Sequence, residues 1–238
     1  MSKYLIKGAS LYGEKIADIL IEDGVISRIA ENIDTADAQV VEAAGQVALP
    51  GLVDIHTHLR QPGYEASETV ETGTRAAALG GYTAVFAMAN SLPVADTAAV
   101  VEQVDRLGKE AGWCRVQPIG AVTVGLKGER LSDIGGMATS TANVRVFSDD
   151  GMCVYDPAVM RRALEYVKTF DGVIAQHAQE PRLTEGAQMN EGKVSADLGL
   201  AGWPAVAEEA IIARDVLLAE HLNSKLHICH LSTKGSIE

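Results

Sequence analysis

The chain has 238 residues, of which 47% are hydrophobic and 22% are charged, and its formal net charge is −12. This length and composition suit a soluble globular protein with one large domain, or with a large domain and a small appendage. Nonspecific binding to nucleic acid or to an anionic membrane requires a basic face, so the negative charge argues against both and favours a small-molecule substrate.

Three cysteines stand at positions 114, 153 and 229, each in an apolar or strand-like context. An odd, widely spaced set argues against a disulfide framework and for a reducing compartment. The amino terminus has no apolar run long enough for a signal peptide, and glycines, polar residues and Pro93 interrupt the uncharged stretch 76–95. We therefore expect a cytoplasmic protein.

Residues 1–50 predict a small, mostly antiparallel β domain, with Asp23-Gly24 as a hairpin turn. Its strands are expected at 4–9, 17–21, 25–29, 40–41 and 46–49. Residues 51–238 instead alternate between strands and helices. Strands are expected at 52–55, 82–88, 116–122, 144–147, 173–175 and 226–228, and helices at 68–79, 96–111, 131–138, 157–170 and 204–223.

This alternation indicates a parallel sheet with crossover helices. About six strand–helix units can be counted, whereas a closed α/β barrel needs eight. The sheet is therefore either open and doubly wound, or an eight-stranded barrel that this chain does not complete. The abrupt end at Glu238 favours the incomplete barrel. Residues 179–203 are expected to form a long irregular loop that covers the site.

Metal-binding side chains follow four of the predicted strands. His56 and His58 leave the strand 52–55 on one face, and Asp150, His177 and His230 follow three later strands. Each alone has an ordinary explanation, as a turn residue or a hydrogen-bonded rim histidine, but five at four strand ends favour a metal site. His56 and His58 suit one ion, His177 and His230 suit a second, and Asp150 is the expected bridge.

Two divalent ions can activate water and polarise a carbonyl group, so this set indicates hydrolysis of an amide-like bond. Arg60 is expected on the same strand face as His58, where its guanidinium could bind a substrate carboxylate or make a surface salt bridge. Asn90 could donate to a substrate or shape the turn before Pro93. His221 and His227 are expected to be structural, because their helix and strand positions point them elsewhere.

Five segments together resemble a type I dihydroorotase of the amidohydrolase superfamily. They are residues 50–60, 147–151, 176–179, 182–190 and 226–233. The resemblance implies a TIM-type (β/α)8 barrel, here incomplete, with a small N-terminal β-sandwich-like domain. It implies reversible conversion of N-carbamoyl-L-aspartate to dihydroorotate in pyrimidine biosynthesis, and two zinc ions per active site. The implied zinc ligands are His56, His58, Asp150, His177 and His230.

The resemblance also implies that His58, Arg60 and Asn90 bind the substrate. Hydantoinases and allantoinases bridge their metals with a lysine on the fourth barrel strand, and the absence of a lysine there favours dihydroorotase. Two features depart from the dihydroorotase pattern: Ala89 replaces a proline, and the chain lacks the family's late aspartate. The general acid/base aspartate is expected beyond Glu238, so no catalytic residue of that kind is expected here and the chain is expected to be a fragment, not fully active alone.

Two alternatives stay open from the residues. The first is another cyclic-amide hydrolase, such as a hydantoinase or allantoinase, which would open 5-substituted hydantoins. The second is a non-catalytic relative that serves as a scaffold for a partner enzyme and would fail to retain zinc. A homodimer and association with aspartate transcarbamoylase are the expected protein partnerships.

Overall fold

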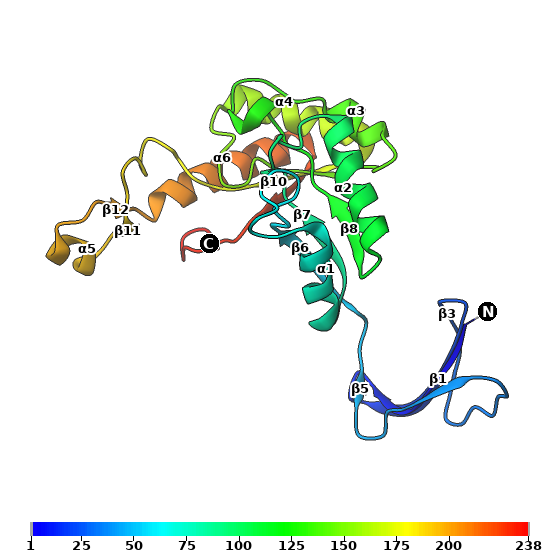
Figure 1. Cartoon of the computed structure of the whole chain (residues 1–238). Coiled ribbons are helices and arrows are strands. Elements are labelled where there is room, and N and C mark those ends of the chain that lie inside the picture. Colours follow the sequence, from blue (N-terminus) through cyan, green and yellow to red (C-terminus); the bar gives the residue numbers. More distant parts are fainter. Residues whose placement is uncertain (1, 238) are drawn as a thin grey trace. The chain divides into compact units, whose positions relative to one another are not determined.

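The computed structural model describes residues 2–237 of the chain, which divides between Gly51 and Leu52 into two compact units (Figure 1). The first unit is a five-stranded sheet of order β3-β2-β1-β4, with β5 also paired to β1. Its strands are β1 (Lys3–Leu11), β2 (Lys15–Glu22), β3 (Val25–Ala30), β4 (Gln39–Glu42) and β5 (Val47–Ala48).

The first three strands of this unit form an antiparallel meander, as the sequence predicts, but β4 and β5 both run parallel to β1. The sheet is therefore mixed rather than mostly antiparallel. The physical reason is the crossover at residues 31–38: Ile33 packs into a small core with Leu5 and Leu20, and the chain then returns on the far side of β1.

The second unit alternates strands and helices, and every pairing between its strands is parallel. Its strands are β6 (Leu52–Thr57), β7 (Tyr82–Ala87), β8 (Arg115–Pro118), β9 (Val146–Phe147), β10 (Val173–Gln176), β11 (Met189–Asn190), β12 (Gly202–Trp203) and β13 (Lys225–Ile228). Its α-helices are α1 (Val70–Leu79), α2 (Ala98–Ala111), α3 (Ile134–Thr139), α4 (Pro157–Val167), α5 (Lys193–Leu198) and α6 (Val206–Leu222). The expected α/β class is confirmed.

The main strands lie in the order β6-β7-β8 and β9-β10-β13, and a parallel bridge between Gly120 and Phe147 joins the two groups. A Cβ atom on Gly120 would lie 2.8 Å from Met137 Sδ and 2.9 Å from Phe147 Cδ1, so the close approach at this junction requires glycine. Because the strands are parallel, their carboxyl ends lie along one edge.

The largest hydrophobic cluster is built from α2, α3 and α4 together with strands β9 and β10. Phe147, Ile174, Met160 and Leu164 are each fully buried in it. Methionine, leucine and aromatic side chains fill the space between helices and sheet, and this packing fixes the strand ends that carry the site. No described helix is long and apolar enough to cross a membrane.

Two sequence-based expectations about this unit are wrong. The apolar residues Leu52, Val53 and Ile55 predict a buried strand, yet they are 48%, 52% and 52% exposed. The reason is that β6 is an edge strand, which pairs only with β7 among the described residues. Residues 179–203 are also not wholly irregular, because β11, α5 and β12 lie within them.

Candidate metal centre

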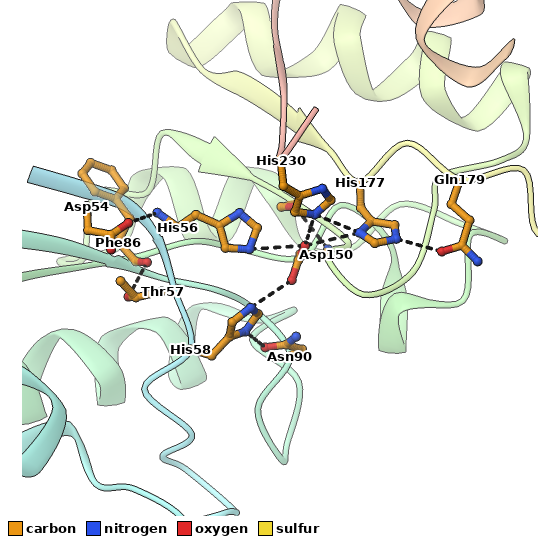
Figure 2. Close-up of polar contacts among 11 residues, drawn as sticks. Asp54, His56, Thr57, His58, Phe86, Asn90, Asp150, His177, Gln179 and His230 are labelled. Carbon is orange, nitrogen blue, oxygen red and sulfur yellow. Dashed lines mark hydrogen bonds and ion pairs between the residues drawn. The ribbon is translucent and has the colours of Figure 1, made fainter. Parts of the chain in front are cut away.

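Two histidines come from the end of β6. The Thr57 hydroxyl donates to the Phe86 carbonyl at 2.8 Å, and the Met88 amide donates to the Thr57 carbonyl at 2.8 Å, so the last residues of β6 are held against β7. The His56 amide also donates to Asp54 Oδ1 at 3.0 Å. His56 lies on the strand and His58 follows it directly, which places both rings at its carboxyl end (Figure 2).

The carboxylate at the centre comes from the turn after β9. Asp150 is 5% exposed, and its amide donates to the Ser148 hydroxyl at 3.1 Å. The neighbouring Asp149 accepts hydrogen bonds from the amides of Val122 and Thr123 at 2.7 and 3.0 Å, and from the Thr123 hydroxyl. The two adjacent carboxylates therefore have different roles, because only Asp150 faces the histidines.

Four imidazole rings converge on Asp150 (Figure 2). The distances to the nearest carboxylate oxygen are 3.4 Å from His56 Nε2, 3.4 Å from His58 Nε2, 3.5 Å from His177 Nδ1 and 3.1 Å from His230 Nε2. His177 Nδ1 and His230 Nε2 are also 3.0 Å apart. The carboxylate therefore lies between a pair of histidines from β6 and a pair that follows β10 and β13.

Hydrogen bonds on the outer side of two rings set their orientation. His58 Nδ1 lies 3.0 Å from Asn90 Oδ1, and His177 Nε2 lies 2.8 Å from Gln179 Oε1. The Gln179 amide group in turn donates to the Thr184 hydroxyl at 2.7 Å. An N–H that donates outward leaves the other ring nitrogen free to act as a ligand, which is the usual arrangement around protein-bound metals.

The charges at the centre favour an ionised carboxylate among histidines. Burial raises the pKa of Asp150, but hydrogen bonds from His177 and His230 and the charges of His56 and His58 outweigh burial and hold this pKa well below its usual range. Burial also lowers the pKa of His56, whereas the hydrogen bond to Asp150 raises the pKa of His230.

The donor set fits a divalent metal ion. His56, His58 and Asp150 form one group whose ligand atoms lie within 4.8 Å of one another, and Asp150, His177 and His230 form a second. Imidazole nitrogens with a carboxylate oxygen are ligands that borderline-soft ions such as zinc accept. Both groups share Asp150, so the arrangement could hold two neighbouring ions with one carboxylate between them.

Four other polar residues were considered in the sequence, and the structure places them differently. Arg60 does not continue the strand face of His58: β6 ends at Thr57, and Arg60 is exposed with φ 61°. The alternation argument fails there because it holds only within a strand. Asn90 does lie in the site, in contact with His58. His221 and His227 belong to neither metal-competent group among the described residues.

Sequence reasoning missed a buried polar network behind His177. Gln176 is fully buried, and its Nε2 donates to Asp215 Oδ2 at 2.8 Å. Arg214 donates through Nε to Asp215 Oδ1 at 2.8 Å and also bonds the Val154 and Tyr155 carbonyls. The signal in the sequence was the adjacent Arg214-Asp215 pair, which stands between apolar residues in the middle of α6.

Comparison with known proteins places the chain in a family. A family model described as Dihydro-orotase-like matches residues 45–236. The dihydroorotase of Streptomyces coelicolor is 69% identical over 238 residues, which are 100% of this chain and 56% of that protein. The dihydroorotase of Mycobacterium tuberculosis is 55% identical, over 98% of this chain and 55% of that protein. The chain thus spans about half the length of these curated relatives.

Solved structures show the same fold at low sequence identity. An L-hydantoinase (dihydropyrimidinase) from Arthrobacter aurescens superposes with a TM-score of 0.77 at 21% identity, covering 100% of this chain and 55% of that chain. A dihydropyrimidinase from Brevibacillus agri gives 0.73 at 20% identity, covering 99% and 53%. The match of the family model and the identity to curated relatives together show that the chain belongs to the dihydroorotase-like family.

Proposed function

We propose that the protein is a zinc-dependent dihydroorotase, which interconverts N-carbamoyl-L-aspartate and dihydroorotate in pyrimidine biosynthesis. The observation that carries this proposal is the position of Asp150, which lies within 3.5 Å of a ligand nitrogen on each of four histidines. The substrate in this proposal is taken from the name dihydroorotase, which relatives at 69% and 55% identity carry.

In this proposal His56 and His58 would hold one zinc ion and His177 and His230 would hold a second, with Asp150 as a ligand available to both groups. Bound zinc would supply a Lewis acid for the substrate carbonyl and would lower the pKa of water. The low pKa of Asp150 keeps its carboxylate ionised, and the outward hydrogen bonds keep the rings of His58 and His177 in place.

Substrate binding is assigned to residues at the β6 and β7 strand ends. Asn90 Oδ1 is engaged by His58, which leaves its amide Nδ2 free to donate to a substrate carboxylate. Arg60 is exposed two residues beyond His58 and is proposed as the second carboxylate-binding group. The general acid/base aspartate remains a prediction for a position beyond Glu238.

The strand order supports an incomplete TIM-type barrel over a doubly wound sheet. In a doubly wound sheet the strand order reverses at a switch point, whereas here β6, β7, β8, β9, β10 and β13 follow one another without reversal. We therefore propose six consecutive strands of an eight-stranded barrel, with the first unit as part of a β-sandwich-like domain. A homodimer, association with aspartate transcarbamoylase and a cytoplasmic location remain predictions.

The test combines zinc content with turnover. The zinc-loaded chain should retain about two ions, and His58→Ala should lower this number, whereas His227→Ala, which removes an exposed histidine outside the site, should not. Ring opening of dihydroorotate that His58→Ala abolishes would confirm the activity and refute the expectation that the acid/base group lies beyond Glu238. Turnover of hydantoins without dihydroorotate would favour a hydantoinase, and failure to retain zinc would favour a non-catalytic scaffold.

A further inference from the structure

The first turn of α6 contacts the segments that follow two of the site histidines. The Glu180 amide, three residues after His177, donates to the Ala207 carbonyl at 2.9 Å. On the next residue of the helix, the Glu208 side chain accepts hydrogen bonds from the segment that follows His230. The amino-terminal turn of one helix therefore contacts both chain segments that leave this half of the site.

The Glu208 carboxylate has an unusually complete set of donors. Oε1 accepts from the Thr233 amide at 2.9 Å, the Thr233 hydroxyl at 3.0 Å and the Ser236 hydroxyl at 2.8 Å. Oε2 accepts from the Ser232 hydroxyl at 2.5 Å and from the Ser232 amide at 3.2 Å. Two backbone amides and three hydroxyls thus fix residues 232–236 to the helix.

This carboxylate is held in its charged form. Glu208 is 8% exposed, and burial raises its pKa, but the hydrogen bonds from Ser232, Ser236 and Thr233 outweigh burial and lower the pKa to about 2. Hydrogen bonds to an ionised acceptor are about twice as strong as neutral ones. The contact between α6 and residues 232–236 is therefore strong and persists at neutral pH.

His230 needs such support from outside its strand. β13 ends at Ile228, so no ladder hydrogen bond holds the His230 backbone, and its side chain is 46% exposed. Its φ of 29° lies in the left-handed region, which residues other than glycine adopt at a cost. A strained, half-exposed residue keeps one conformation only when its neighbours fix it, and Ser232 is the first residue after it with side-chain hydrogen bonds.

We propose that Glu208 is a positioning residue, which fixes residues 232–236 and thereby holds His230 against Asp150 for binding of the second metal ion. Among the described residues Glu208 makes no hydrogen bond or ion pair to Asp150 or to a site histidine, and its contacts are with Ser232, Thr233 and Ser236. Its charge also contributes to the raised pKa of His230. This inference rests on the two-ion site proposed above, and it adds Glu208 to that site as a residue that positions His230.

The test is a zinc titration of Glu208→Gln, with Glu220→Gln as the matched control. Glu220 is exposed on the same helix, and the same change there should leave both affinities unaltered. In Glu208→Gln an NH2 group replaces one carboxylate oxygen and cannot accept the hydrogen bonds that this oxygen accepts. Residues 232–236 should then hold His230 less firmly, so the affinity for the second ion should fall by about 10–100-fold. The first ion, held by His56 and His58, should bind as before and so shows that the variant is folded.

Two further measurements distinguish a wrong role for Glu208 from a wrong two-ion site. Ser232→Ala removes a donor at the other end of the contact, so it should weaken the second ion too, and its effect should not add to that of Glu208→Gln. In the metal-free chain, the Ser232 and Thr233 amides should exchange hydrogen at least about tenfold faster in Glu208→Gln. Unchanged zinc affinities or unchanged exchange would overturn the role of Glu208, whereas a wild-type chain that binds fewer than two ions would overturn the two-ion site itself.

Discussion

The strongest test of the packing behind the site is Asp215→Ala. The Asp215 side chain is fully buried, one of its oxygens accepts from Arg214 and the other accepts from Gln176. Gln176 precedes His177, and Arg214 also bonds the Val154 and Tyr155 carbonyls in the loop after Asp150. Loss of this one carboxylate therefore affects two of the segments that carry site residues.

The expected loss of unfolding free energy in Asp215→Ala follows from the contacts of this side chain. Removal of Asp215 leaves the Arg214 guanidinium, which is 19% exposed, without its counter-charge, and takes one acceptor from the buried Gln176 amide. Breaking one partner of a buried ion pair costs about 3–5 kcal/mol. Alanine favours helix more than aspartate does, so helix propensity acts in the opposite direction and cannot account for the loss. The expected cost is therefore a large part of a typical unfolding free energy of about 5–15 kcal/mol.

Urea unfolding followed by tryptophan fluorescence measures this cost. Trp113 and Trp203 both lie in the second unit, so the signal reports the unit that contains Asp215. The control is Glu110→Ala, which removes an exposed ion pair to Arg106 in α2 and should cost no more than about 0.5 kcal/mol. A loss below about 1 kcal/mol for Asp215→Ala would refute the argument, and Arg214→Met with Asp215→Leu should recover part of the stability.

Three more outcomes are expected. Asp150→Asn should weaken zinc binding by more than about 100-fold in chelator competition, because both metal-competent groups share this carboxylate. Gly108→Ala should destabilise the second unit by about 1–3 kcal/mol in urea unfolding, because its Cβ would lie 2.5 Å from Val116 Cβ. Burial raises the pKa of Cys153 and of Cys229 to about 12, so neither should react with a thiol reagent at pH 8 until the chain unfolds.

The two substitutions each have a control, and the thiol prediction has a refuting outcome. Asp197→Asn, on the exposed side of α5, should leave zinc affinity unchanged, and an equal loss in both variants would contradict the assignment of Asp150. Gly135→Ala should cost less than Gly108→Ala, because its added methyl group would meet the hydroxyl end of the half-exposed Tyr166, which can rotate away. Rapid labelling of all three thiols in the native chain would refute the burial argument.

Local patterns in the sequence were sufficient for the α/β class and for the order of the elements. Strand periodicity, helix-ending glycines such as Gly112 and the strand-end motifs each depend on neighbours within a few residues. The family followed from the same motifs, and the comparison confirmed it. The short helix Lys193–Leu198 was missed because six residues give no clear period, and β11 and β12 were missed because their pairing is between residues 13 apart.

The sequence by itself determined which residue types follow each strand, since that is a property of the chain order alone. The sequence already favoured Asp150 as the shared ligand, but only the tertiary structure shows why: Asp150 faces four histidines, whereas Asp149 is turned to Thr123, because the two follow the same strand and differ in the direction of a turn. It also placed Asp215 and Glu208 behind the site. Their partners lie 39 and 24 residues away, and contacts at such separations depend on how strands and helices pack, which no local pattern encodes.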